Sequence, residues 1–207
     1  MDYIIIGVFY NQQEDMTIMK ESEILESFCS TGALLTGHFL LRSGLHSDHY
    51  FQAALVLQHT LIAAKLCAAM AEPWKNMGIE TVISPAVGGI IVGQEVGRAL
   101  GIRAVFAEKD DNSNLVLRRG FTFKPGEKVL VAEDVVTKGG RVQQTIDLVR
   151  AHGATPVGVT VMVDRSLEPV DFGIPFKSLL KLDLQTFDPA ECPLCKQGMP
   201  IDHPGSK

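Results

Sequence analysis

Between residues 81 and 163 the sequence alternates short apolar runs with longer segments of helical periodicity. The segments 89–100 and 140–152 have apolar residues at the three- and four-residue spacing of amphipathic helices. The apolar runs, which have the length of buried strands, are 81–84, 103–107, 128–132 and 156–163. Buried strands that alternate with helices form a mostly parallel sheet covered on both faces. The sequence therefore predicts an α/β fold.

The rest of the chain predicts smaller elements around this sheet. Residues 22–30 are expected to form a short helix, 34–52 short strands and turns, and 59–77 a helix perturbed near Pro73. The polar and then basic segment 110–126 is typical of a long mobile hairpin. At 207 residues the chain predicts one domain, 16–207, and residues 1–15 are interpreted as an N-terminal extension, possibly disordered.

Charge and hydropathy exclude several function classes. The chain carries 19 Lys and Arg against 24 Asp and Glu, a net charge of −5, which argues against binding nucleic acid or an anionic membrane through bulk charge. No apolar stretch approaches the roughly 20 residues that a membrane span needs, and the start of the chain is a poor signal peptide. The four cysteines are therefore expected to be reduced, in a cytoplasmic protein.

The most informative motif runs from Val129 to Arg141. An apolar strand ends in two adjacent carboxylates, Glu133 and Asp134, and a turn with one Thr and two Gly then opens a helix. Backbone N–H groups at such a helix end suit a phosphate, whereas two carboxylates suit ribose hydroxyls, which donate hydrogen bonds to them. The alternative is that the acids merely cap the helix. The motif predicts a sugar-phosphate site, and the sequence lacks the glycine patterns of triphosphate hydrolases and dinucleotide-binding folds.

This motif resembles the phosphoribosyl-pyrophosphate signature of the type I phosphoribosyltransferases. Residues 36–52 are similar to the hood of the orotate-specific branch, here about residues 22–58, and Val163-Asp164-Arg165 resembles its base-binding strand end. Leu117 to Phe121 and the C-terminal Cys-Pro-Leu-Cys are similar to one bacterial group of that branch. The resemblance implies a central, mostly parallel sheet flanked by helices, with a small N-terminal hood and a mobile catalytic hairpin loop.

The resemblance also implies a reaction. Orotate and phosphoribosyl pyrophosphate would give orotidine 5′-monophosphate and pyrophosphate, in pyrimidine synthesis, with Mg²⁺ bound mainly through the substrate and no metal ligand set supplied by the protein. It implies a homodimer with shared active sites, and it makes Asp134 a catalytic residue. The residues assigned to phosphoribosyl pyrophosphate are Glu133, Asp134, Val135, Val136, Thr137, Lys138, Gly139, Gly140 and Arg141.

Orotate recognition is carried over to Arg165, Arg42 and Thr137. A guanidinium offers a planar fork of donors to a carboxylate or carbonyl, which makes Arg165 the main candidate. A surface ion pair with Asp164 is the alternative for Arg165, and a solvated loop position is the alternative for Arg42.

The pyrophosphate side matches the family less well. Lys109 and Arg119 are the residues implied as catalytic, but Glu108 stands where those relatives have arginine. The loop from Ser84 to Gly89 lacks the lysine of better-known relatives, and solvated hairpin charges are an even alternative for Arg118 and Arg119. Glu108 and the missing loop lysine keep open a non-catalytic nucleotide-binding regulator on the same fold. A purine phosphoribosyltransferase is a further alternative, because it would share the sugar-phosphate site.

Cys192 and Cys195 have the spacing of half a zinc site. Because the sequence shows no second closely spaced pair, free thiols are the favoured interpretation and zinc the less favoured one. The hood histidines at 38, 46, 49 and 59 have no ligand spacing and are expected to be solvated.

Overall fold

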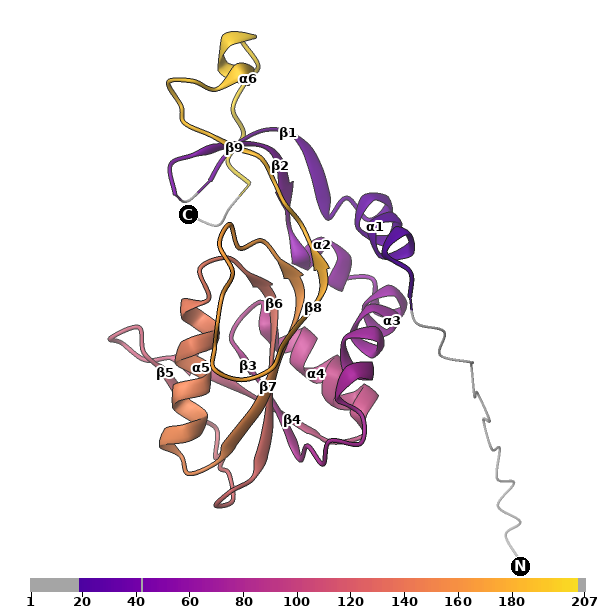
Figure 1. Ribbon diagram of the computed structural model, residues 1–207, viewed down its shortest axis with the longest axis vertical. Coiled ribbons are helices and arrows are strands. Elements are labelled where there is room, and N and C mark those ends of the chain that lie inside the picture. The colour runs from indigo at the N-terminus through magenta and orange to yellow at the C-terminus, as the bar shows by residue number, and fades with distance from the viewer. Residues whose placement is uncertain (1–18, 42, 205–207) are drawn as a thin grey trace, which may run out of the picture.

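The computed structural model describes residues 19–41 and 43–204 (Figure 1). The proposed extension, residues 1–15, lies outside the described residues, as does Arg42.

A six-stranded sheet forms the centre of the molecule, in the order β5-β4-β3-β6-β7-β8. All neighbouring strands are parallel except β4 and β5, which form an antiparallel hairpin at one edge. This sheet confirms the predicted α/β fold. Its strands are β3 (Thr81–Pro85), β4 (Arg103–Lys109), β5 (Leu115–Leu117), β6 (Lys128–Val136), β7 (Thr155–Asp164) and β8 (Phe176–Lys181).

Helices cover both faces of the sheet because successive strand residues point to opposite sides. Val82 and Leu130 pack in the cluster that includes α3 (Thr60–Ala71) and α4 (Gly89–Leu100), whereas Ile83 packs in the cluster on the other face. That second face is covered by α5 (Gly140–Ala151), whose buried residues are Val142, Thr145, Ile146 and Val149. The strands are buried on both sides, as their continuous apolar runs predict.

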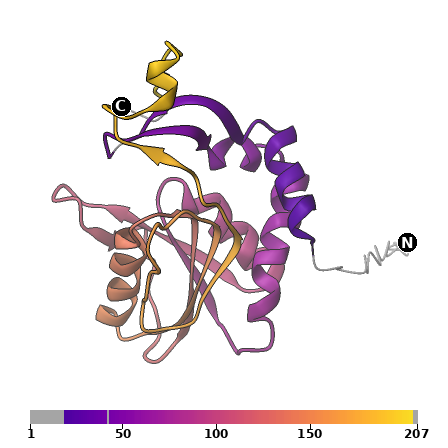
Figure 2. The ribbon, with the colours of Figure 1, turned by 45° about the horizontal axis from the view of Figure 1, so that its top comes forward.

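The predicted hood consists of a helix and a small sheet. Helix α1 (Glu21–Ser30) precedes the antiparallel pair β1 (Leu34–Leu40) and β2 (His46–Phe51), and α2 (Ala53–Leu57) leads back to the main body. The end of the chain joins this sheet through β9 (Thr186–Phe187) and continues into the short helix α6 (Pro193–Lys196). Figure 2 shows this C-terminal segment, in yellow, against the hood strands.

The hood lies over the carboxyl edge of the central sheet. Strand β8 ends at Lys181 and the chain enters the hood sheet at Thr186, so few residues separate the two. Ser47 in β2 donates a hydrogen bond of 2.7 Å to the carbonyl of Gln185 in this connection. The hood therefore faces the strand ends where α/β proteins bind ligands.

Three segments differ from the sequence expectation. Strand β6 continues to Val136, so Glu133 and Asp134 lie within the strand rather than after it, and their backbone stays paired with β7. The expected long hairpin is a short one, β4 with β5, followed by turns over 118–126. Helix α3 ends at Ala71, and a 3-10 turn, η1 (Glu72–Trp74), contains Pro73.

The expected solvation of the hood histidines is wrong for two of the four. His38 and His46 are 3% and 5% exposed, because the C-terminal segment covers them. Among the described residues, no helix is both long and apolar enough to cross a bilayer.

Candidate active site

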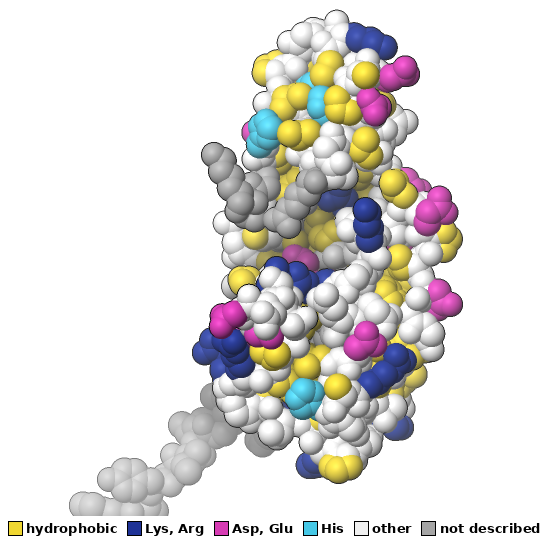
Figure 3. All heavy atoms as spheres, turned by 90° about the vertical axis from the view of Figure 1, so that its left-hand side faces the viewer, with side chains coloured by type: hydrophobic (Ala, Val, Ile, Leu, Met, Phe, Trp, Pro, Cys, Tyr) yellow, Lys and Arg dark blue, Asp and Glu magenta, His cyan; other side chains and the backbone are white. Residues whose placement is uncertain are grey.

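The carboxyl ends of β3, β6 and β7 meet at one edge of the sheet, since these three strands are parallel neighbours. The loop from Ala86 to Gly88 follows β3, the turn from Thr137 to Gly139 follows β6, and Arg165 follows β7 directly. Figure 3 shows a hollow between hood and main body, with basic and acidic side chains along its margin. The predicted sugar-phosphate residues therefore come together at the carboxyl edge of the sheet.

The acidic pair rests on two glycines at the start of α4. A Cβ atom on Gly89 would come within 2.9 Å of Glu133 Oε1, and one on Gly88 would lie 3.1 Å from Asp134 Cγ and closer still to Oδ2. The absence of side chains at these two positions therefore lets the N-terminus of α4 approach both carboxylates. The positive end of a helix dipole favours negative charge at that place.

Burial dominates the electrostatics of the pair. Glu133 is 5% exposed, and desolvation raises the pKa of its carboxyl well above the usual value. Neighbouring Asp134 raises that pKa further, while Arg141 acts in the opposite direction. Backbone donors hold both side chains: Asp134 N donates to Glu133 Oε1 at 3.1 Å and Val135 N to Asp134 Oδ1 at 2.8 Å. The arrangement favours hydrogen-bond donors such as ribose hydroxyls in front of the pair.

The turn after β6 has the geometry of an anion site. Gly139 adopts a left-handed conformation, with φ +76°, and a Cβ there would lie 2.9 Å from the Phe172 ring. The turn opens α5, whose first N–H groups have no partner within the helix. Thr137 and Lys138 are exposed beside this turn. This geometry suits a phosphate held by backbone N–H groups.

Val135 and Val136 contribute backbone rather than side chain to this edge. Val136 is 2% exposed and belongs to the core under α5, and Val135 packs against the core on the opposite face. Both residues pair with β7. By pairing with β7 and packing in the core, they hold in place the strand that carries Glu133 and Asp134.

Two guanidinium groups at this edge have buried nitrogen atoms without a hydrogen-bond partner among the described residues, namely Arg141 Nη1 and Arg165 Nε. A buried donor without a partner is destabilising, and it is typical of a place where a ligand supplies the acceptor. Burial lowers the pKa of Arg165, which the Tyr50 phenol opposes, and an arginine retains its charge under such a shift.

The ion pair considered as an alternative for Arg165 is not formed in the structure. Asp164 instead contacts Lys181, with Nζ 3.3 Å from Oδ2, and accepts the backbone N–H of Ser166 at 2.8 Å. The backbone N–H of Arg165 donates to the carbonyl of Val136 at 2.8 Å. The guanidinium of Arg165 is thus left for another acceptor.

The basic residues of the β4–β5 region have different surroundings. Arg119 forms a bidentate ion pair with Glu108, Nε and Nη2 each 2.8 Å from one carboxylate oxygen. The pair is exposed, and the Arg119 hydrogen bond lowers the pKa of Glu108. Lys109 is exposed at the end of β4. Glu108 therefore holds the arginine that the sequence assigned to pyrophosphate.

Two adjacent aromatic residues at the end of β2, Tyr50 and Phe51, have separate surroundings. Phe51 is 3% exposed and packs on Phe28, with ring centroids 4.8 Å apart, so it is part of the core. Tyr50 is half-buried, and its phenol opposes the lowering of the Arg165 pKa by burial. Tyr50 is accordingly the hood residue associated with the predicted base site.

Comparison with known proteins agrees with this geometry. Residues 56–188 match the model of the phosphoribosyl transferase domain. The chain is 49% identical over 189 residues to the orotate phosphoribosyltransferase of Desulforamulus reducens, covering 91% of this chain and 98% of that protein. It is 50% identical over 185 residues to the orotate phosphoribosyltransferase of Thermotoga maritima, covering 89% and 97%.

Solved structures of the same fold are more distant in sequence. The orotate phosphoribosyltransferase of Aeropyrum pernix has a TM-score of 0.62 at 22% identity, covering 77% of this chain and 93% of that one. The adenine phosphoribosyltransferase of Rhodothermus marinus has a TM-score of 0.61 at 20% identity, covering 78% and 99%. These two structures share the type I phosphoribosyltransferase fold, and at about 50% identity over most of its length the chain belongs to the orotate phosphoribosyltransferase family.

Proposed function

We propose that this protein transfers the phosphoribosyl group of phosphoribosyl pyrophosphate to orotate, giving orotidine 5′-monophosphate and pyrophosphate in pyrimidine synthesis. The observation that carries the proposal is the convergence of three features at one sheet edge. These are the acidic pair of β6, the glycine turn that opens α5, and the unpaired guanidinium nitrogen of Arg165. They match the three parts of the reacting system: ribose hydroxyls, 5-phosphate and an anionic base.

In the proposed reaction the bond between the anomeric carbon and the pyrophosphate oxygen breaks, and a bond from that carbon to a ring nitrogen of orotate forms. That nitrogen loses its proton, which leaves with the pyrophosphate. The backbone N–H groups of the 137–140 turn hold the 5-phosphate, and Glu133 and Asp134 orient the two ribose hydroxyls. Arg165 aligns the base through its carboxylate or a carbonyl. Fixing both partners in this way converts an encounter in solution into an oriented step.

Mg²⁺ would enter with the pyrophosphate substrate. The residues present fit such an ion, because carboxylate oxygens are the ligands that Mg²⁺ prefers and Asp134 is only half-buried beside the hollow. When bound with the substrate, the ion supplies charge neutralisation for the departing pyrophosphate. The protein's own contribution is the acidic pair that positions the hydroxyls.

The pyrophosphate end is proposed for Lys109 and Arg119, with Arg119 leaving Glu108 when substrate binds. The ion pair is exposed, so its exchange for a pyrophosphate contact needs little free energy. Movement of this segment over the site would also exclude water from the activated sugar. Contacts to orotate from Thr137 and Arg42 complete the proposed set.

The deciding experiment is the loss of orotate ultraviolet absorbance on addition of phosphoribosyl pyrophosphate and Mg²⁺. Activity with orotate and none with adenine, guanine or hypoxanthine is the expected result. Turnover of a purine instead would make the protein a purine phosphoribosyltransferase. Binding of the donor without turnover of any base would favour a regulator.

We also propose a homodimer with shared sites, in the cytoplasm. Sharing is tested by mixing two variants of low turnover, Arg119→Ala and Asp134→Asn, after partial unfolding and reassembly. Recovered turnover in the mixture supports a site built from both protomers. A mixture no more active than its components contradicts it.

A further inference from the structure

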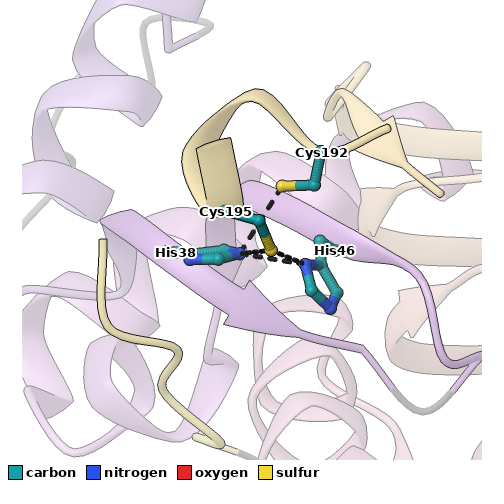
Figure 4. Close-up of side chains that lie close together, drawn as sticks. All are labelled: His38, His46, Cys192 and Cys195. Atoms are coloured by element: carbon teal, nitrogen blue, oxygen red, sulfur yellow. Dashed lines mark hydrogen bonds between the residues drawn. The ribbon is translucent and has the colours of Figure 1, made fainter. Parts of the chain in front are cut away.

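Two histidines of the hood and two cysteines of the C-terminal segment converge at one point (Figure 4). His38 lies in β1 and His46 in β2, while Cys192 immediately precedes α6 and Cys195 lies within it. One ligand atom from each of the four residues lies within 4.8 Å of the others. The cluster belongs to the outer end of the hood and contains none of the proposed substrate residues.

The distances between sulfur and nitrogen atoms are close to those of a tetrahedral zinc site. Ligand atoms placed about 2.1 Å (N) and 2.3 Å (S) from one Zn²⁺ are about 3.4 to 3.8 Å apart. The S···N distances are 3.3 Å for Cys195–His46, 3.5 Å for Cys192–His38 and 3.7 Å for Cys195–His38. The distance between His38 Nε2 and His46 Nδ1 is 2.9 Å, so this edge would open by about 0.5 Å around the ion. The four ligand atoms lie within 4.8 Å of one another, so a longer edge would close by about 1 Å at most.

The surroundings of His38 favour a metal ligand. Its Nδ1 lies 2.8 Å from the carbonyl oxygen of Met199, which can only accept a hydrogen bond. Nδ1 therefore carries the proton, and the lone pair of Nε2 points toward the cysteines. A ligating histidine almost always donates its second N–H to a carbonyl or carboxylate in this way.

The C-terminal segment needs such a cross-link because it has almost no apolar core of its own. Within residues 188–203 the structure buries only Cys192, and Met199 and Ile201 are 41% and 37% exposed. Besides the His38–Met199 contact, backbone hydrogen bonds join this segment to the hood, from Asp202 N to His38 O and from Leu40 N to Asp202 O. Small units without a sufficient core are commonly stabilised by a disulfide or a structural metal.

We propose that His38, His46, Cys192 and Cys195 bind one Zn²⁺, which fastens the C-terminal segment to the hood. Two thiolates and two imidazoles are ligands for zinc and not for Mg²⁺. All four coordination positions are filled by the protein, so the site is structural rather than catalytic. The site joins segments more than 140 residues apart and supports the two strands that lead to Tyr50 and the proposed orotate site.

The test is the metal content of the whole purified chain, measured by inductively coupled plasma mass spectrometry after expression with added zinc. About one zinc per chain is expected in the wild type. Cys195→Ser and His46→Ala should each reduce it at least about tenfold. Matched controls are Cys29→Ser, an exposed thiol outside the cluster, and His49→Ala, a histidine of the same strand paired with Asp48; both should keep their zinc.

A second measurement does not depend on variants that fold poorly. Metal-free wild type titrated with Co²⁺ should give the visible absorption of tetrahedral cobalt and a sulfur-to-cobalt band in the near ultraviolet, saturating at one equivalent. Zinc below about a tenth of an equivalent, together with no such spectrum, would overturn the proposal. A wild type that contains a Cys192–Cys195 disulfide after purification under reducing conditions would overturn it too, in favour of a redox pair.

Discussion

Gly88 lies directly against the carboxylate of Asp134, so close that a Cβ atom at position 88 would overlap Oδ2. The backbone of Gly88 is in the right-handed helical region, with φ −58° and ψ −41°, which any residue can adopt. Glycine is therefore required here for space and not for conformation. The loop after β3 and the acidic pair of β6 form one unit, although 45 residues separate them in the sequence.

Gly88→Ala should displace the Asp134 carboxylate while leaving the backbone unstrained. We expect the KM for phosphoribosyl pyrophosphate to rise about tenfold or more, because a misplaced hydroxyl acceptor loses a charge-assisted hydrogen bond. Steady-state kinetics with the donor varied measure this effect, and Gln94→Ala, exposed on the same helix, is the control. Unchanged kinetics would mean that the exact position of Asp134 has no role in donor binding.

The raised pKa of Glu133 predicts a pH-dependent stability. Because the folded state holds this proton more tightly than the unfolded chain, ionisation of Glu133 destabilises the fold as pH rises above the ordinary carboxyl value of 4.5 and through the raised one. Glu133→Gln should therefore match the wild type near pH 4 and exceed its free energy of unfolding at pH 8. Urea unfolding at both pH values measures this effect. If the free energies of unfolding of variant and wild type differ equally at pH 4 and pH 8, the raised pKa of Glu133 is refuted. The same variant should bind the donor more weakly.

The central sheet could be predicted because its signals are local. The alternation of strands and helices from 81 to 163 predicts that β3, β6 and β7 run parallel. Helices α4 and α5 begin at the glycines that the sequence places there. The extension of β6 to Val136 was not predicted, since adjacent acids are read as the end of a strand. Only the tertiary pairing of Glu133 and Val135 with β7 overrides that pattern.

The unpredicted features depend on contacts between distant segments. Strand β8 is a short run with lysines at positions 177 and 181, and it becomes a strand by pairing with β7. His38 and His46 come close together because β1 pairs with β2. Cys192 and Cys195 reach these histidines only because the C-terminal segment folds back onto the hood. Arg119 likewise pairs with Glu108 only because the β4–β5 hairpin brings the two residues together.

Gly139→Ala combines two kinds of strain that a second substitution can separate. The left-handed backbone costs about 1–2 kcal/mol for a residue with a Cβ, and the Cβ also meets the Phe172 ring. We expect a loss of about 2–4 kcal/mol in the free energy of unfolding together with a loss of donor binding. In a Phe172→Ala background the ring is absent, so adding Gly139→Ala should lower the free energy of unfolding only by the cost of the left-handed backbone. A wild-type affinity for the donor in the single variant would contradict the proposed phosphate turn.

Glu108→Gln tests whether the exposed ion pair restrains Arg119. Removing the carboxylate frees the guanidinium and deletes a negative charge next to the proposed pyrophosphate position, so the KM for the donor should fall about two- to fivefold. The gain should shrink at high salt, which screens exposed charges.

Arg119→Ala and Lys109→Ala should lower kcat with a modest loss of binding. If neither changes kcat, the hairpin has no part in the reaction.

Arg165 provides the sharpest test of base specificity, because its Nε is buried and has no hydrogen-bond partner within residues 19–41 and 43–204. Arg165→Ala removes a charged donor to orotate, which should raise the KM for orotate about 10- to 100-fold and that for the donor about threefold at most. Arg165→Lys should rescue little, since a single ammonium cannot reproduce a planar fork. Arg150→Ala, exposed on α5, controls for loss of positive charge. An equal rise in both Michaelis constants would indicate that Arg165 supports the site as a whole and does not recognise the base.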